Sequence, residues 1–181
     1  MPRLSPTENL IYATTIKMME TTPFEKIKIV DLVKKAGISR SAFYNNFSSV
    51  YEVVQSMEEL ILSSLPSLEL AVNTYTKYKR DSDRTELMAL MEYFRALCGP
   101  NGDSLFESKV KERSKKICEA ELALRAPEWS PIEREMIAAY LAGGHWNTYK
   151  WLAFHTTEIS MKDATKVFDS LSDMVDTLLK K

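Results

Sequence analysis

Apolar residues recur at helical spacing along most of the chain. The clearest early example runs from Ile29 to Ala36, where apolar side chains stand at positions i, i+3, i+4 and i+7. Few stretches alternate polar and apolar residues, and the 181 residues include only five glycines, which argues against a sheet protein. The pattern therefore predicts an all-α fold.

Helix start signals punctuate this pattern. Ser5-Pro6-Thr7-Glu8 and Ser130-Pro131-Ile132-Glu133 both combine an N-cap serine, an early proline and a glutamate that can bond back to the cap. With the periodicity, they predict helices that start near residues 6, 29, 40, 50, 83, 104, 131 and 161. The third of these is expected to end near residue 47.

Gly37 separates two of the predicted helices at a tight turn. A left-handed backbone just past a helix end is easily reached only without a Cβ atom, and Ser39 can cap the helix that follows. Phe43 and Phe47 lie four apart on the inner face of that short helix. This arrangement predicts a helix-turn-helix, although the same corner also occurs inside ordinary α-helical cores.

The outer face of the short helix carries side chains that suit DNA. Arginine can contact a guanine edge, asparagine an adenine, and serine or tyrosine hydroxyls the phosphates. Residues 1–50 hold seven basic and four acidic residues, whereas the rest of the chain holds 17 and 21, so the net charges of +3 and −4 favour a polyanion at the N-terminal end. The residues that face outward are Arg40, Ser41, Tyr44 and Asn45.

The segment from Pro6 to about Leu60 resembles the N-terminal domain of the TetR/AcrR transcriptional regulators. Phe24 stands at the family's aromatic position after the first helix, DLV and AGIS (within 31–39) fit its second helix and turn, and FYNNF (43–47) fits its recognition helix. The resemblance implies an N-terminal three-helix helix-turn-helix DNA-binding domain over residues 1–62.

The resemblance extends into the C-terminal half. FRALCGPNGDSLFESKVKE (94–112) and YLAGGHWNTYKWL (140–152) are similar to a Gram-positive subgroup that includes DhaS-like regulators. This similarity implies a C-terminal helical ligand-binding and dimerisation domain over residues 63–181, with dimers formed by the last two helices.

Three positions depart from the family pattern. Lys28 replaces a serine or threonine N-cap, Ala42 replaces a threonine, and Val50 replaces a lysine that meets phosphate. We expect backbone N–H groups at residue 50, helped by nearby serines, to contact the phosphate instead; alternatively, Val50 packs inside the domain. The full set of expected DNA-binding residues is Lys28, Ile29, Arg40, Ser41, Ala42, Tyr44, Asn45, Asn46, Ser48 and Ser49.

The stretch from Met136 to Gly144 has no polar side chain apart from the Tyr140 hydroxyl. A helix that is apolar on every side needs cover on every side, either from a second copy of the chain or from the core of a monomer. Small residues here allow a neighbouring helix to approach closely, which favours a homodimer. The expected interface residues are Ala139, Gly143, Val167, Leu171, Val175 and Leu178.

Aromatic and methionine side chains of the C-terminal half allow two interpretations. They form either the core or the lining of a pocket for a small apolar or aromatic effector, which the resemblance implies for many relatives. The pocket candidates are Met88, Met91, Phe94, Phe106, Trp129, Tyr140, Trp146 and Tyr149.

Enzymes, metalloproteins and membrane proteins find little support. The sequence contains no phosphate-binding loop, nucleophile elbow, HExxH or paired-cysteine motif, so we expect no catalytic residue and no cofactor. His145 and His155 lack metal-ligand spacing, and Cys98 and Cys118 are expected to be reduced thiols. The absence of a long apolar stretch or export signal favours the cytoplasm.

These observations predict a DNA-binding transcriptional regulator. It would bind a palindromic operator as a homodimer, act as a repressor, and leave the DNA when an effector binds. The alternative is a TetR-like protein-interaction module or co-regulator in which DNA binding is weak or lost.

Overall fold

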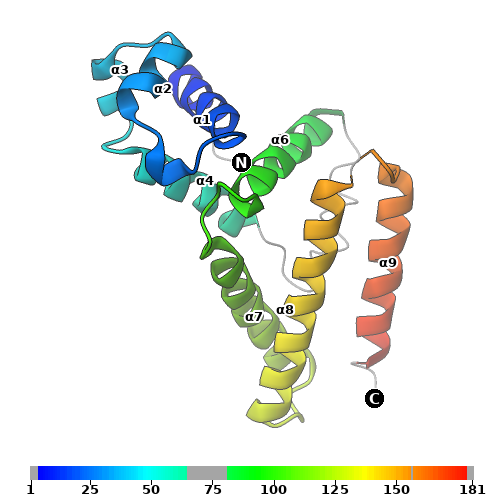
Figure 1. The fold of residues 1–181 in the computed structure, drawn as a ribbon. Helices are drawn as coiled ribbons and strands as arrows, with labels where there is room; N and C mark the ends of the chain where they lie inside the picture. The colour runs from blue at the N-terminus through cyan, green and yellow to red at the C-terminus, as the bar shows by residue number, and fades with distance from the viewer. Residues whose placement is uncertain (1–3, 65–80, 156, 179–181) are drawn as a thin grey trace. The chain divides into compact units, whose positions relative to one another are not determined.

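In the computed structural model, the regular elements of the described residues are all helical (Figure 1). The structure describes residues 4–64, 81–155 and 157–178, and within these ranges it contains no strand, so the all-α prediction is confirmed. A 3₁₀ turn, η1, spans Phe24–Lys26. The α-helices are α1 (Pro6–Met19), α2 (Ile29–Ala36), α3 (Arg40–Tyr44), α4 (Val50–Ser64), α6 (Asp81–Cys98), α7 (Phe106–Arg125), α8 (Pro131–Phe154) and α9 (Met161–Leu178).

The predicted start signals of α1 and α8 are confirmed. The Ser5 hydroxyl accepts a hydrogen bond from the Glu8 N–H at 3.1 Å, and the Glu8 carboxylate accepts one from the Ser5 N–H at 2.7 Å. Ser130 and Glu133 form the same reciprocal pair at the start of α8. These contacts satisfy N–H groups that the first turn of a helix otherwise leaves without partners.

The chain forms two compact units. Unit 1 contains residues 4–64 together with 89–106, and unit 2 contains the other described residues, 81–88, 107–155 and 157–178. Residues 89–106 belong to the predicted second domain, yet they pack with the N-terminal helices. The division of function between the two predicted domains remains a prediction.

The core of unit 1 joins all of its helices. Ile11 of α1, Leu32 of α2, Phe43 of α3, Met57 of α4 and Leu97 of α6 are each fully buried. Burying such side chains contributes about 1.5–3 kcal/mol each, before the entropy of ordering is subtracted. This shared core fixes α3 on the other helices of the unit.

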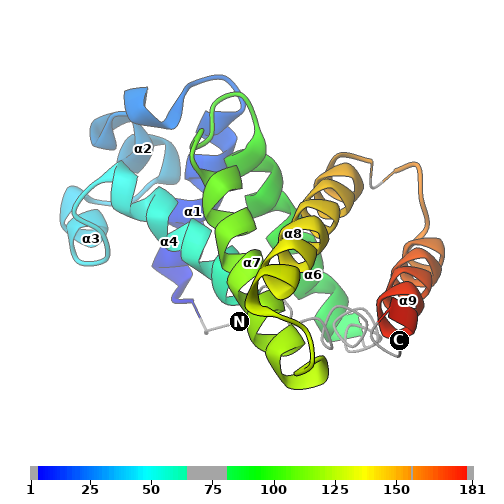
Figure 2. The same ribbon diagram turned by 90° about the horizontal axis from the view of Figure 1, so that it is seen from below.

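In unit 2, α8 packs against both α7 and α9, which Figure 1 shows on its two sides; Figure 2 shows the same helices from below. Cys118 and Leu122 of α7 pack against Leu141 of α8 in one cluster, while Leu152 of α8 packs against Phe168 of α9 in another. The two clusters lie at different levels along α8, so that helix is held against both of its neighbours.

Candidate nucleic-acid interface

The predicted helix-turn-helix is present in unit 1. Gly37 has a φ of +69°, the left-handed conformation that its position was predicted to need, and the Ile38 N–H bonds to the Val33 carbonyl at 3.1 Å. The Ser39 hydroxyl caps α3 by accepting from the Ala42 N–H at 3.0 Å. Phe43 and Phe47 are buried, as their spacing predicted, so the inner side of α3 packs on the core of unit 1.

α3 exposes a polar face. The exposed side chains are the four predicted to face outward, Arg40, Ser41, Tyr44 and Asn45. Tyr44 is 57% exposed, and its ring makes an edge contact with the buried Phe43 ring, which orients the phenol away from the core. The face therefore offers a guanidinium, two hydroxyls and an amide on one short helix.

α3 is shorter than predicted, because it ends at Tyr44 rather than near Phe47. The Asn46 side-chain amide donates to the Ala42 carbonyl at 2.7 Å, and the Asn46 N–H turns to the Phe43 carbonyl instead. Asparagine competes for backbone partners in this way and tightens a helix end. Asn46 is half-buried and engaged with the helix, and Ala42 is also half-buried.

The start of α2 adds an exposed lysine. Lys28 is the N-cap residue, and its side chain makes no capping hydrogen bond, in agreement with the missing serine or threonine. Ile29 is half-buried and lines an apolar recess of about 340 Å³. The other residues of the recess are Phe24, Glu25, Ile27, Val50 and Tyr51.

The start of α4 is capped by side chains of its own first turn. The Glu52 carboxylate accepts hydrogen bonds from the Ser48 N–H at 2.6 Å and the Ser48 hydroxyl at 2.5 Å, while the Ser49 hydroxyl accepts from the Glu52 N–H at 3.1 Å. These bonds from Ser48 lower the pKa of Glu52. Both serines are thus already used in capping α4, and a negative charge lies where a phosphate contact was predicted.

Val50 is buried, with 7% of its surface exposed. This agrees with the alternative in which Val50 packs inside the domain, next to Phe24 and Ile27 around the apolar recess. The pattern Ser49-x-x-Glu52 is a capping-box signature, so the sequence contained the signal that Ser49 would cap α4, although the Glu52 carboxylate bonds to Ser48.

Val50→Lys is therefore expected to destabilise unit 1. Replacing a buried valine by a lysine removes apolar packing and brings a charge to the edge of the core, which should cost about 1–2 kcal/mol. Thermal denaturation should show a lower melting temperature, while Gln55→Lys, which adds the same charge on the exposed side of α4, should not lower it. An unchanged melting temperature, with a salt dependence of DNA binding steeper by about two units per dimer, would restore the phosphate-contact interpretation.

The eight candidate pocket residues are divided between the units. Met91, Phe94 and Phe106 belong to unit 1, whereas the remaining residues belong to unit 2. The side chain of Met88 lies outside the described residues. Phe106 and Trp146 are buried, Met91, Trp129 and Tyr149 are half-buried, and Tyr140 is 76% exposed.

Trp146 lies beneath a charged layer of unit 2. The Lys111 and Lys150 ammonium groups stand 6.0 and 5.6 Å from the centre of its ring, and Glu107 bridges the two at 2.6 and 3.2 Å. Hydrogen bonding to Lys111 lowers the pKa of Glu107. Cation–π contacts of this length stabilise the helix packing around a buried indole.

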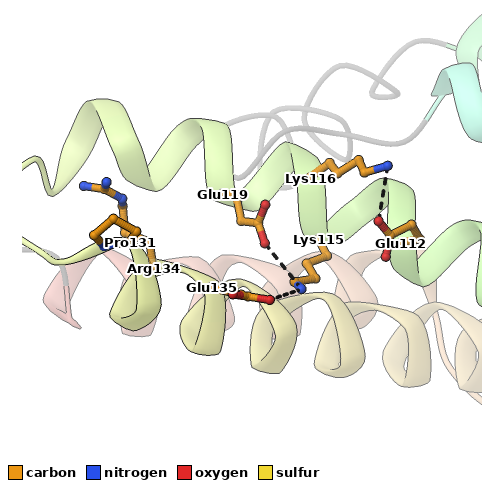
Figure 3. Close-up of a pocket in the computed structure, with 7 residues that line it drawn as sticks. All are labelled: Glu112, Lys115, Lys116, Glu119, Pro131, Arg134 and Glu135. Atoms are coloured by element: carbon orange, nitrogen blue, oxygen red, sulfur yellow. Dashed lines mark hydrogen bonds and ion pairs between the residues drawn. The ribbon is translucent and has the colours of Figure 1, made fainter.

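An open groove between α7 and α8 is lined by charged side chains (Figure 3). It has a volume of about 420 Å³, and Lys115 lies between Glu135 at 2.8 Å and Glu119 at 3.5 Å. None of the seven candidate pocket residues with a described side chain lines this groove or the recess beside Val50. The other lining residues are Glu112, Lys116, Pro131 and Arg134.

The expected dimer residues occupy different environments. Ala139 is exposed and Gly143 half-buried on α8, and Val167 is 47% exposed on α9. Leu171 is half-buried, and Val175 packs against the α7–α8 cluster inside unit 2. The side chain of Leu178 lies outside the described residues.

An apolar face of α8 is exposed in the single chain. Ile132, Met136 and Tyr140 are 67%, 69% and 76% exposed, and they follow one another at four-residue spacing, so they share one face. A Cβ atom added at Gly143 or Gly144 would meet no atom within 4 Å. The structure leaves open space above this face, which we call the outer α8 face.

Neither the cysteines nor the histidines form a reactive cluster in the described residues. Cys98 and Cys118 are not disulfide-bonded, and burial raises the pKa of Cys118 to about 11, so its thiol stays protonated at neutral pH. His145 is half-buried, and desolvation lowers its pKa, while His155 stacks on Trp151. In the described ranges, no three metal-ligating side chains come together and no helix is long and apolar enough to cross a membrane.

Comparison with solved structures finds chains of similar fold. The chain is similar to the dihydroxyacetone kinase operon activator DhaS, with a TM-score of 0.60 and 15% sequence identity over 97% of both chains. It is also similar to a transcriptional regulator of the TetR/AcrR type from Aquifex aeolicus VF5, with a TM-score of 0.54 and 16% identity over 93% of this chain and 99% of the other. No protein-family model and no curated protein sequence matches the chain. The chain therefore has the fold of the TetR/AcrR regulators, with an N-terminal helix-turn-helix and a helical C-terminal part.

Proposed function

We propose that the protein is a DNA-binding transcriptional regulator that binds a palindromic operator as a homodimer. The main observation in support of this proposal is the exposed polar face of α3. The inner face of the same segment is fixed by the buried Phe43 and Phe47, and the left-handed turn at Gly37 precedes it. A helix so short buries little by itself, and its outward side chains are types that read base edges and phosphates. The similarity in fold to transcriptional regulators supports the same proposal.

The proposed division of labour assigns DNA contacts to unit 1. Arg40 would read a guanine edge, Asn45 an adenine, and Tyr44 and Ser41 would reach phosphates. Lys28 is exposed at the start of α2 and would supply a further phosphate contact. The negative Glu52 at the start of α4 opposes one phosphate, so we expect a modest affinity for non-specific DNA.

The proposed dimer uses the outer α8 face. An exposed apolar stripe of Ile132, Met136 and Tyr140 favours burial against a second copy, and the open space above Gly143 leaves room for a helix to approach. A two-fold dimer would present two α3 helices to the two halves of a palindrome. We propose that α9 contributes through Val167 and Leu171, whereas Val175 serves the core of its own chain.

We also propose that the protein represses transcription in the cytoplasm and that a small apolar or aromatic effector relieves this repression. A reporter gene placed behind the operator would test the direction of regulation: lower expression with the protein present supports repression, and higher expression supports activation. Thermal-shift screening of small aromatic compounds would test the effector, because a ligand that binds only the folded protein raises its melting temperature.

Arg40→Ala is the mutation that tests base reading most directly. If Arg40 contacts a guanine, its loss should weaken operator binding by about 1–3 kcal/mol, roughly five- to 150-fold, and relax base preference at one position in each half-site. Tyr44→Phe is the matched control on the same face, because losing a phosphate hydroxyl should weaken all DNA sequences alike. Binding to a randomised operator library checks both, and an unchanged base preference for Arg40→Ala would remove Arg40 from base reading.

A second candidate function is supported by the start of α4. Glu52 occupies the first turn of that helix and Val50 is buried, so the helix offers no lysine to the phosphate. A protein-interaction module or co-regulator with weak or lost DNA binding would tolerate both features. Purified protein that fails to bind any DNA near its own gene, yet forms a complex with another regulator, would favour this candidate.

A further inference from the structure

Asn101 lies far from the helix-turn-helix in the sequence, but it bonds to the turn between α1 and η1, just before that motif. The Asn101 side-chain amide donates to the Met19 carbonyl at 2.8 Å, and the Asn101 backbone carbonyl accepts from the Phe24 N–H at 3.1 Å. Met19 is the last residue of α1 and Phe24 is the first of η1. A single residue therefore bonds to both ends of the turn that connects these two elements.

The side-chain bond from Asn101 satisfies a backbone carbonyl that lacks a partner within its helix. Carbonyls in the last turn of a helix have no partner within the helix, and the Met19 carbonyl finds one in Asn101. The neighbouring Met18 carbonyl is used differently, because it accepts from the Thr21 and Thr22 N–H groups at 3.2 and 3.0 Å. Asn101 thus supplies a partner that the local sequence does not provide.

The turn that carries Asn101 is itself firmly built. The Gly102 N–H bonds to the Gly99 carbonyl at 3.1 Å, and a Cβ atom at Gly102 would lie 2.1 Å from the Leu97 carbonyl oxygen. Leu97 is fully buried in unit 1. Earlier in α6, the Tyr93 ring meets the Tyr12 ring of α1 edge-on at 5.9 Å. Asn101 is therefore presented from a fixed position.

The tethered turn leads straight into the DNA-facing elements. Phe24, the first residue of η1, and Ile27, the residue just after it, are both buried, and the Ile27 N–H bonds to the Phe24 carbonyl at 3.1 Å. The next residue, Lys28, is the N-cap of α2, which has no side-chain cap to set its start. The direction in which α2 leaves this junction therefore depends on how Phe24 is held.

We propose that Asn101 is a positioning residue for the DNA-binding face, acting through the α1–η1 turn to fix the start of α2 and, with it, the helix-turn-helix. This inference rests on the proposed function of unit 1. It makes DNA affinity depend on a residue that belongs to the α6–α7 connection rather than to the N-terminal helices.

The test compares Asn101→Ala with Ser104→Ala in the full-length protein. Ser104 is an exposed residue a few positions further along the same connection, so the control removes a polar side chain without touching the tether. Asn101→Ala should weaken operator binding about tenfold, the factor that one lost hydrogen bond of ordinary strength produces. Ser104→Ala should bind like the wild type.

Hydrogen exchange distinguishes a local effect on the α1–η1 turn from a general loss of stability. Asn101→Ala removes the side-chain bond to the Met19 carbonyl and keeps the backbone carbonyl that accepts from the Phe24 N–H. Because the α1–η1 turn then loses one of its two bonds, it should open more often, and the Phe24 amide should exchange faster by about tenfold. Amides in the middle of α4, such as those of Val53 and Val54, should keep their wild-type rates. Unchanged operator affinity together with unchanged exchange at Phe24 would overturn the proposal. Faster exchange throughout α1–α4 would also overturn it, because Asn101 would then support the whole unit rather than one turn.

The two levels of the inference fail separately. If the wild type binds no DNA near its own gene, the proposed function fails, and exchange at Phe24 still decides whether Asn101 holds the α1–η1 turn. If the wild type binds its operator and Asn101→Ala binds equally well, the proposed function stands and Asn101 has no role in positioning the DNA-binding face.

Discussion

Gly143→Leu should convert the protein from a dimer to a monomer and remove tight operator binding. A leucine at this position projects from the outer α8 face, where we propose that the second copy packs. Overpacking costs about 1–3 kcal/mol at each such contact, and a two-fold axis repeats the clash on both copies. A monomer reaches only half of a palindrome, so operator affinity should fall by roughly 100-fold or more.

The protomer itself should tolerate this substitution. A Cβ atom at Gly143 meets nothing within 4 Å in the single chain, and leucine is a better helix former than glycine. Sedimentation at micromolar concentration measures the oligomeric state. The control for an added apolar side chain is Ala120→Leu, at an exposed position of α7, which should leave the dimer intact. A wild type that is already monomeric at micromolar concentration, or a Gly143→Leu variant that stays dimeric, would refute the proposed interface.

Gly102→Ala should destabilise unit 1 by about 3 kcal/mol, the upper end of the usual overpacking cost. The added Cβ atom would lie 2.1 Å from the Leu97 carbonyl oxygen and 2.6 Å from that of Ala96, and backbone atoms cannot move aside as a flexible side chain can. The end of α6 or the turn must shift, which disturbs a segment packed on α1.

Gly144→Ala provides the control for this prediction. A Cβ atom there meets nothing within 4 Å, and alanine is favoured over glycine inside a helix by about 1 kcal/mol, so stability should be kept or rise. Hydrogen exchange separates the two units: Gly102→Ala should speed exchange in α1 and in the last turns of α6. The three tryptophans all belong to unit 2, so their fluorescence should remain that of the wild type. Unaltered exchange in α1 would show that the turn can absorb the extra methyl group.

Local signals were sufficient to predict most of the helical architecture. The serine–proline starts at Ser5 and Ser130, and the glycine after α2, identified helix ends because capping uses neighbouring residues only. The inward and outward faces of α3 followed from the four-residue spacing of Phe43 and Phe47. These features depend on contacts within about one helical turn.

Features that depend on distant contacts could not be predicted. The bond between Asn101 and Met19 joins residues 82 apart, and the residues around Asn101 indicate a turn without indicating its partner. For residue 50 the sequence left two interpretations open, a phosphate contact through backbone N–H groups or a side chain packed inside the domain, and only the structure shows that the Val50 side chain is buried. The capping role of Ser49 was missed for a different reason, since the Ser49-x-x-Glu52 signature was present in the sequence and was not used.

Binding of the purified full-length protein to DNA from around its own gene tests the central claim most directly. Fluorescence anisotropy against each fragment, with random DNA as competitor at physiological salt, measures affinity and specificity together. The proposal predicts that one fragment binds at least about 10³-fold more tightly than random DNA, with a protected region of two-fold symmetry that two protomers occupy. Equal affinity for every fragment, or no binding to any of them, would contradict the assignment of α3 as a recognition helix.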